Sequence, residues 1–253
     1  MSVRGVSGKT VLITGAAGGI GTATARAFSE AGANVVLTDI GPVPIDPPWD
    51  GASVYVQADV TDPDAVAGVF DHARQLYGQV DAVVHAAGVL TTGPVSELTD
   101  SEWDRVLTVN ATGTMVVTRA ASRVLSGPAS ITVVSSNAGA TPRAGMAAYA
   151  ASKAAATAFV RSLGLELAPM GIRCNVISPG STDTAMLRGM WDAADGSAAT
   201  IAGSPEDFRL GIPLGRLADP SEIAGCAVFL ASSAARHITL HDLRVDGGAT
   251  LDQ

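Results

Sequence analysis

Two ionisable side chains, Tyr149 and Lys153, stand four residues apart in the stretch TPRAGMAAYAASKAAA (residues 141–156), which is otherwise mostly small and apolar. On a helix, residues i and i+4 project from the same face, one turn apart. A free phenol has a pKa of ~10, and a neighbouring ammonium stabilises the phenolate and moves that pKa toward neutrality. The pair therefore predicts a tyrosine that works as an acid/base group. The alternative for an isolated match is a surface tyrosine beside a solvated lysine.

Two polar residues upstream favour the chemical interpretation. Ser136 follows the strand-like run SITVVS, thirteen residues before Tyr149, where its hydroxyl can hold a substrate oxygen next to the phenol. Asn110, in VNATG, falls within a long apolar helical pattern. That position is unfavourable for asparagine unless its amide or a local helix distortion is used. Together with the tyrosine and the lysine, these residues form a constellation suited to proton transfer.

A glycine-rich turn, TGAAGGIG (residues 14–21), joins the first strand pattern to a helical pattern. Gly15 permits a tight turn, Gly19 lets the backbone approach a pyrophosphate, and Gly21 lets the helix pack closely on the strand. The turn lacks the Lys-Ser/Thr ending of a P-loop. It predicts a dinucleotide site, with a purely structural strand-to-helix turn as the alternative.

Acidic residues at strand ends indicate which dinucleotide binds. Asp39 ends the second strand pattern about 20 residues after the glycines, where a carboxylate accepts hydrogen bonds from the adenosine ribose hydroxyls. The same carboxylate repels the 2′-phosphate of NADP, so the sequence predicts NAD. Asp59 and Val60, after the third strand pattern, are expected to flank the adenine.

The TGxxxGIG turn, the asparagine, the serine and the YxxxK pair are together marks of the short-chain dehydrogenase/reductase family, which this chain resembles from about residue 9 to residue 248. The resemblance implies a single NAD-binding domain over residues 1–253. In that family pattern Tyr149 transfers the proton and Ser136 orients the substrate. Lys153 binds the nicotinamide ribose and lowers the tyrosine pKa, and Asn110 holds a water in a proton relay.

The resemblance also implies which residues line the cofactor site. The family's Asn-Asn-Ala-Gly element reads HAAG here, so His85 replaces the first asparagine while the backbone approach of Ala87 and Gly88 is kept. In SPGSTDT, the Thr182 backbone is expected near the carboxamide and Thr184 near a phosphate. The cofactor residues expected in all are Gly15, Gly19, Ile20, Gly21, Asp39, Asp59, Val60, Ala87, Gly88, Tyr149, Lys153, Pro179, Gly180, Thr182 and Thr184.

Further segments, among them TPRAGMAAYAASKAA and HITLHDLRVDGGATL, resemble members of the family that oxidise a ring alcohol of a cyclohexadiene carboxylate to a catechol used in siderophores. The small-molecule substrate then carries a carboxylate and needs a cation. Arg143, on the loop before Tyr149, is the first candidate for a bidentate pair, and Arg188 is the second. Each is alternatively a solvated loop charge. Met146 is expected against the ring, or in the core.

Other functions remain to be compared with this one. A related dehydrogenase of antibiotic pathways acts on an analogue in which an amine replaces one hydroxyl, and the sequence does not separate the two. A non-catalytic dinucleotide sensor usually lacks the reactive tyrosine or lysine. An acyl-chain or sugar reductase using NADPH is disfavoured by Asp39 and Arg143. His237 and His241 have metal-ligand spacing only on a helix, whereas β-branched residues between them predict extended chain, so no metal is expected.

Composition excludes several classes of partner. The net charge of -8 argues against a nucleic-acid groove and an anionic membrane surface. The N-terminus enters a strand pattern without an apolar signal core, and no later run reaches about eighteen apolar residues, so the chain is expected in the cytoplasm. Two cysteines are too few for a disulfide scaffold, and both are expected to be reduced and buried.

The elements that must position these residues follow a regular alternation. The runs TVLIT, NVVLT, SVYVQ, DAVVH, SITVVS and IRCNVIS alternate with longer helical patterns. This order predicts an α/β fold: one doubly wound Rossmann-type domain with a parallel sheet of about seven strands and helices on both faces. The exception is GPVPIDPPWD (residues 41–50), whose prolines predict an extended crossover loop.

Two further segments have functional expectations. Residues 183–211, rich in small and polar residues, are predicted to form a substrate lid within the domain. The helices around Asn110 and Tyr149 are apolar on more than one side, which favours burial against a second subunit. The family resemblance implies a homotetramer, and a homodimer is the alternative.

Overall fold

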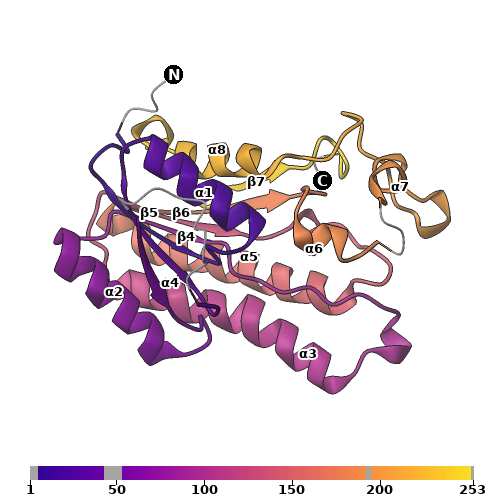
Figure 1. The fold of residues 1–253 in the computed structure, drawn as a ribbon, viewed down its shortest axis with the longest axis horizontal. Helices are drawn as coiled ribbons and strands as arrows, with labels where there is room; N and C mark the ends of the chain where they lie inside the picture. Colours follow the sequence, from indigo (N-terminus) through magenta and orange to yellow (C-terminus); the bar gives the residue numbers. More distant parts are fainter. Residues whose placement is uncertain (1–4, 43–52, 192–194, 252–253) are drawn as a thin grey trace.

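The computed structural model describes residues 5–42, 53–191 and 195–251. Within these residues the strands form one parallel sheet in the order β3-β2-β1-β4-β5-β6-β7, which confirms the predicted doubly wound α/β domain (Figure 1). The strands are β1 Thr10–Thr14, β2 Asn34–Asp39, β3 Val54–Gln57, β4 Ala82–His85, β5 Ala129–Val134, β6 Ile172–Pro179 and β7 Asp242–Val245.

The strand order reverses next to β1. The chain runs outward from β1 through β2 to β3 and then returns to the other side of β1 as β4, from which it continues outward to β7. Connections that leave the ends of β1 and β4 in opposite directions open a crevice at the carboxyl edge of the sheet. The glycine-rich turn after β1 and the Ala-Ala-Gly segment after β4 (residues 86–88) both lie at this crevice.

Helices cover both faces of the sheet (Figure 1). One apolar core joins α1 and α8 to the sheet, and the other joins α2, α4 and α5 to the opposite face. The α6–α7 region stands beyond the sheet at the right of Figure 1. The helices are α1 Gly19–Glu30, α2 Pro63–Tyr77, α3 Asp100–Leu107, α4 Gly113–Val124, α5 Ala147–Leu167, α6 Ala185–Arg188, α7 Ser197–Ala202 and α8 Pro220–Ala231.

Local sequence signals start several of these helices. At α2, Asp62 accepts hydrogen bonds from the backbone N–H groups of Asp64 and Ala65, and a proline occupies the first turn. The same aspartate-proline start recurs at α8, where Asp219 and Glu222 form a capping box. Such caps satisfy backbone donors that the helix itself leaves free.

Other expectations from the sequence have mixed outcomes. Cys174 is buried and free, but Cys226 is only half-buried, because α8 turns that side chain toward the margin of its core. The chain from His237 to His241 is not helical, as predicted. The proline-rich crossover falls largely within residues 43–52, outside the described residues. None of the helices described combines the length and apolar character that a membrane span requires.

Candidate active site

Two adjoining cavities open at the carboxyl edge of the sheet. The large cavity, about 620 Å³, is lined by the glycine-rich turn and by Asp39, Asp59 and Val60. The small cavity, about 150 Å³, is lined by residues that include Ser136 and Tyr149. Both cavities share a wall made by Ile20, Ala86, Gly88, Thr184 and Met186. They therefore form one cleft with two compartments.

The glycine-rich turn is shaped by close backbone approach. Gly15 has a left-handed φ of 68°, and a Cβ there would lie 2.5 Å from the backbone nitrogen of Ala87. A Cβ on Gly21 would overlap the carbonyl oxygen of Gly15, which is why α1 packs so closely on the turn. A Cβ on Gly19 would lie 2.9 Å from the Thr184 side chain, across the cleft. The backbone geometry thus requires glycine at positions 15 and 21, and a side chain at position 19 would displace Thr184.

The large cavity has the chemistry of a dinucleotide site. The N-terminus of α1 has no side-chain cap and no acidic residue in its first turn, so its N–H groups are available to a pyrophosphate. At the other end, the Asp39 carboxylate accepts hydrogen bonds from the backbone N–H groups of Ala17 (3.0 Å) and Ile40 (2.8 Å). These contacts fix its oxygens at the end of β2, where they can also accept from ribose hydroxyls. The residues present fit a nicotinamide dinucleotide.

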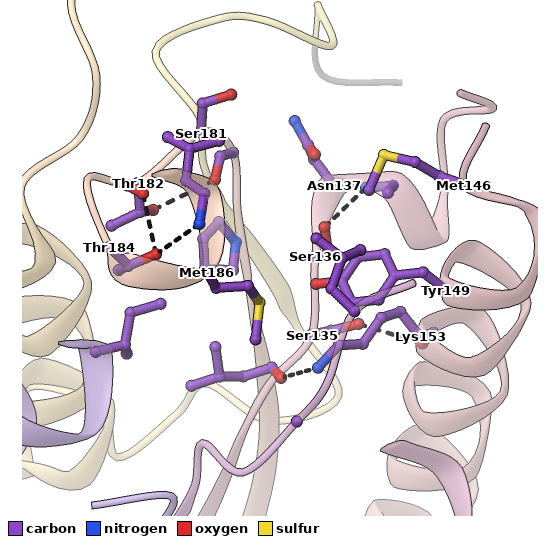
Figure 2. Close-up of a pocket in the computed structure, with 18 of the residues that line it drawn as sticks. Ser135, Ser136, Asn137, Met146, Tyr149, Lys153, Ser181, Thr182, Thr184 and Met186 are labelled. Carbon is purple, nitrogen blue, oxygen red and sulfur yellow. Dashed lines mark hydrogen bonds between the residues drawn. The ribbon is translucent and has the colours of Figure 1, made fainter. Parts of the chain in front are cut away.

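The helix α5 carries the predicted pair into the small cavity (Figure 2). Tyr149 and Lys153 are both buried, with 8% and 6% of their surface exposed. The Lys153 ammonium lies 5.7 Å from the centre of the Tyr149 ring and donates a hydrogen bond to the carbonyl oxygen of Val134 at 3.0 Å. Figure 2 shows Ser136 on the same side of the cavity, facing Thr182, Thr184 and Met186 across it. Ser136, Tyr149 and Lys153 therefore line one cavity, as the sequence predicted.

The electrostatics of the pair differ from the expectation. Burial raises the pKa of Tyr149 above its ordinary value, and hydrogen bonding to Ser136 acts in the opposite direction. Burial also lowers the pKa of Lys153 to about 8. The net shift of the Tyr149 pKa is therefore upward and not toward neutrality as expected, because desolvation outweighs the stabilising effect of a charge 5.7 Å from the ring. A further positive charge near the phenol would act in the same direction as Ser136 and lower the Tyr149 pKa.

Asn110 occupies a π-helical turn, Thr108–Thr112, between α3 and α4. Its amide oxygen accepts from the backbone N–H of Val89 (2.8 Å), and its amide nitrogen donates to the Val89 carbonyl (2.9 Å) and to the Ser152 hydroxyl (2.9 Å). Both expected solutions, a helix distortion and a bonded amide, are present. The residue clamps the chain after β4 to α5. The main-chain carbonyl oxygen of Asn110 accepts a hydrogen bond from the Thr114 hydroxyl. The expected role of Asn110 in holding a water of a proton relay stays a prediction.

His85, the departure from the family pattern, lies below the cleft in the sheet and lines neither cavity. It is paired in register with Thr14 of β1, and its Nδ1 is 2.7 Å from the Thr14 hydroxyl. Its Nε2 is buried without a hydrogen-bond partner among the described residues. Burial, with a smaller contribution from Lys153, lowers the pKa of His85 to about 3. The imidazole is therefore neutral and adds no charge beneath the lysine.

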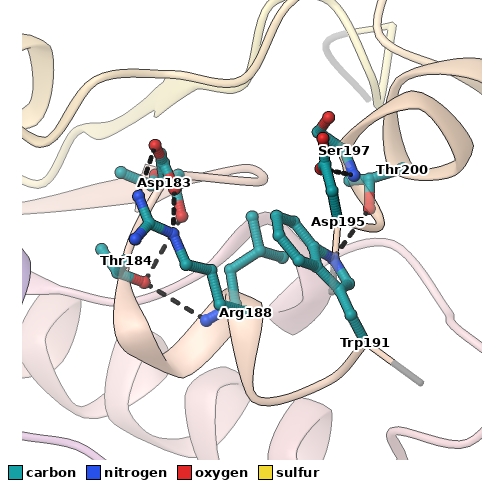
Figure 3. Close-up of polar contacts among 9 residues, drawn as sticks. Asp183, Thr184, Arg188, Trp191, Asp195, Ser197 and Thr200 are labelled. Carbon is teal, nitrogen blue, oxygen red and sulfur yellow. Dashed lines mark hydrogen bonds and ion pairs between the residues drawn. The ribbon is translucent and has the colours of Figure 1, made fainter. Parts of the chain in front are cut away.

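The two arginines proposed for a substrate carboxylate lie in different places. Arg143 lines the small cavity, as does Met146. Arg188 does not, and it forms a bidentate ion pair with Asp183, with N···O distances of 2.8 and 3.0 Å (Figure 3). The structure therefore does not support the assignment of Arg188 to substrate, because its guanidinium lies outside the cavity lining and pairs with a carboxylate five residues away.

The structure adds a cation that sequence reasoning missed. Arg209, two residues before the end of the predicted lid, lines the small cavity together with the apolar side chains of Leu90, Leu187 and Met190. The only signals in the sequence were its positive charge and its place within the predicted lid. The predicted lid, residues 183–211, supplies several lining residues, and within it the Trp191 indole donates to the Thr200 hydroxyl at 3.2 Å (Figure 3).

The remaining cofactor candidates line the cleft, and their contacts with a dinucleotide stay predictions. Pro179, Gly180 and Thr182 line the small cavity, and Thr184 lines both compartments. A Cβ on Gly88 would lie 3.2 Å from both the Asn110 amide oxygen and the Lys153 nitrogen, so glycine at this position leaves room for these two side chains. Within the described residues, no group of three or more His, Cys, Asp and Glu side chains is arranged to hold a metal ion.

Comparison with known proteins agrees with this geometry. Residues 15–250 match the family model described as enoyl-(acyl carrier protein) reductase. The chain is 43% identical to the 2,3-dihydro-2,3-dihydroxybenzoate dehydrogenase of Bacillus subtilis (strain 168), with 99% of each protein covered. It is 46% identical to the protein of the same name from Escherichia coli (strain K12), over 97% of this chain and 98% of that one.

Solved structures give the same result. A short-chain type dehydrogenase/reductase from Mycobacterium marinum superposes with a TM-score of 0.88 at 31% identity, over 98% of each chain. The 3-ketoacyl-(acyl-carrier-protein) reductase from Brucella melitensis, complexed with NADH, gives 0.83 at 29% identity, over 97% of this chain and 99% of that one. The protein is thus a dehydrogenase that uses a nicotinamide dinucleotide, and it belongs to the short-chain dehydrogenase/reductase family.

Proposed function

We propose that the protein oxidises 2,3-dihydro-2,3-dihydroxybenzoate to 2,3-dihydroxybenzoate with NAD, a step that supplies the catechol of siderophores. One observation carries the proposal: Tyr149 and Arg143, an arginine with no ion-pair partner among the described residues, line the same small cavity, which adjoins the large compartment. A site of this kind suits a secondary alcohol on a molecule that also bears a carboxylate. Two relatives that match nearly the whole chain carry the name of this activity.

The choice of NAD rests on the charge at the end of β2. Asp39 lines the large cavity at the end of β2, so a 2′-phosphate there would meet its carboxylate, and Asp59 and Asp104 add negative charge to the same lining. Arg105, the cation in the described lining, is already bound to the Leu90 carbonyl and the Thr91 hydroxyl. A ribose with two free hydroxyls therefore suits this end of the cleft better than a phosphorylated one.

The side chains of the small cavity have distinct parts in the reaction. The Ser136 and Tyr149 hydroxyls hold the ring alcohol oxygen, and the Tyr149 oxygen, as phenolate, takes the hydroxyl proton. Lys153 stabilises that phenolate by its positive charge. The residues that line both compartments would hold an oxidised nicotinamide beside the carbon that bears the alcohol, where it would supply the hydride acceptor and a second positive charge near the phenol. The resulting ketone tautomerises to the aromatic catechol, which makes the reverse reaction unfavourable.

Other residues of the small cavity position the ring. Arg143 is proposed to bind the carboxylate, because its guanidinium presents paired donors with a geometry that matches a carboxylate. Met146 and Met186 offer polarisable apolar surface to the ring. Residues 183–211 are proposed to act as the lid over this compartment, which they already line in part.

The protein is also proposed to work as a homo-oligomer, a tetramer in the form that the family suggests. On α5, the helix that carries the catalytic pair, Ala154, Ala155 and Ala158 are exposed, and Leu165 has 66% of its surface exposed. An exposed face of small apolar side chains suits close packing against a second copy. Apart from further copies of the chain, the partners proposed for this protein are small molecules.

The deciding experiment is an initial-rate assay of NADH formation with purified protein. The substrates are 2,3-dihydro-2,3-dihydroxybenzoate and its amine analogue, 2,3-dihydro-3-hydroxyanthranilate, each tested with NAD and NADP. Fast turnover of the dihydroxy acid with NAD supports the proposal. Preference for the amine analogue would place the same chemistry in an antibiotic pathway. Binding of NADH without turnover of any alcohol would favour the dinucleotide sensor instead.

A further inference from the structure

Two guanidinium groups line the small cavity, and they come from segments far apart in the sequence. Arg143 lies on the loop that precedes α5, and Arg209 lies in the chain between α7 and α8. The two interact electrostatically: the pKa of Arg143 is lowered first by burial and then by the charge of Arg209. Like charges brought together at a partly buried site repel unless an anion lies between them.

No carboxylate of the described residues forms an ion pair with either arginine. The Arg143 side chain has no hydrogen bond in the part of the chain that the structure describes, and Arg209 has one long contact, to the Ser181 hydroxyl at 3.4 Å. Asp246 is the carboxylate that acts on Arg143. Its oxygens already accept from neutral donors, which are Asn137 Nδ2, Thr250 Oγ1 and the Gly248 backbone N–H.

The backbone at Arg209 is held in place before any ligand binds. Arg209 and Ser204 exchange two backbone hydrogen bonds, each of 2.9 Å, across a short turn. The Ser204 hydroxyl also donates to Asp207, and Phe208 at the tip adopts a left-handed φ of 53°. Because this turn is braced, the backbone that carries Arg209 is held at the cavity edge, which reduces the entropy lost when the side chain binds a ligand.

We propose that Arg209 is a second carboxylate-binding residue, which acts with Arg143 to select cyclic alcohols that bear a carboxylate over neutral cyclic diols. The inference rests on the proposed function and extends it by naming the group that sets specificity. A carboxylate between the two guanidinium groups accepts charge-assisted hydrogen bonds from both and removes their mutual repulsion. A neutral diol leaves that repulsion in place. The apolar wall of the cavity then binds the ring in either case.

The kinetic test uses Arg209→Gln and Arg209→Lys, with Arg188→Gln as the matched control. Arg188 lies in the same region of the chain but is paired with Asp183 outside the cavity. We expect Arg209→Gln to lower kcat/KM for the dihydroxy acid by about 10- to 150-fold, mainly through KM, as for loss of a hydrogen bond to a charged group. Oxidation of the unsubstituted cyclohexadiene diol should change little. Arg209→Lys should lose less, because it keeps the charge but not the paired donors.

A binding measurement separates this inference from the proposed function. Calorimetry with 2,3-dihydroxybenzoate and with catechol, each added to the NADH-loaded protein, needs no turnover. We expect the wild type to favour the acid and Arg209→Gln to lose most of that preference while NADH affinity stays unchanged. Equal preference in the wild type and Arg209→Gln, or no preference in the wild type, would overturn the role of Arg209. Failure of the wild type to oxidise the acid, with the binding preference intact, would overturn only the proposed reaction.

Discussion

His85 should make the stability of the protein depend on pH in a way that a single substitution removes. The folded protein holds the imidazole neutral with a pKa of about 3, against an ordinary value of 6.5. At a pH below 6.5, His85 binds a proton in the unfolded chain but stays neutral in the folded protein. Stability therefore falls as the pH drops through 6.5, and the loss continues until the folded pKa is reached.

The size of the effect follows from the two pKa values. Between pH 7 and pH 5 the unfolded-state histidine becomes almost fully protonated, which costs the folded protein about 2 kcal/mol. For a protein of this size that corresponds to roughly 4–8 °C in Tm. His85→Asn keeps a polar side chain that can face Thr14 but does not titrate in this range. We expect this variant to lack that part of the pH dependence.

The assay is thermal and urea unfolding of the wild type and His85→Asn at both pH values, at one protein concentration. His237→Asn, which removes an exposed histidine, is the control. The wild type and the control should lose about 2 kcal/mol more than His85→Asn on acidification. An equal loss in all three proteins would refute the reasoning, since it would mean that His85 is protonated in the fold or that the site rearranges to solvate it.

Three further predictions concern the site and the assembly. Tyr149→Phe should lower turnover by about 10²- to 10⁴-fold, because the proton acceptor is lost, while NADH fluorescence titrations give an unchanged affinity. Asp39→Arg should shift the ratio of kcat/KM values from NAD toward NADP, because a cation replaces the carboxylate at the 2′ position. Ala155→Glu should place a charge on the exposed face of α5 and yield a smaller species in light scattering.

Each of these has a result that contradicts it. Substantial residual turnover in Tyr149→Phe would remove the phenol from proton transfer, and Tyr77→Phe on α2 serves as the control. Unchanged NAD selectivity in Asp39→Arg would show that this carboxylate does not contact the ribose. An unchanged mass in Ala155→Glu, with Ala155→Ser as the conservative control, would mean that this face of α5 is not a subunit interface.

Much of the site was determined by the sequence itself, because it depends on local geometry. The spacing of Tyr149 and Lys153 fixes their common face on any helix, and the glycines after β1 allow one kind of tight turn. The alternation of strand and helix patterns then leaves few topologies besides a parallel doubly wound sheet. Asn110 in an apolar helix likewise indicated the distortion that the π-helical turn provides.

Tertiary structure decided what depends on partners distant in the chain. The bond between His85 and Thr14 requires the register of β1 against β4, and burial there sets the histidine pKa. Burial also raised the pKa of Tyr149, against the expectation from its lysine neighbour. Arg209 reaches the cavity while Arg188 turns to Asp183, although both carry the same charge in the same region. Side-chain type and spacing determine local faces, whereas desolvation and pairing depend on which residues the complete fold places around each charge.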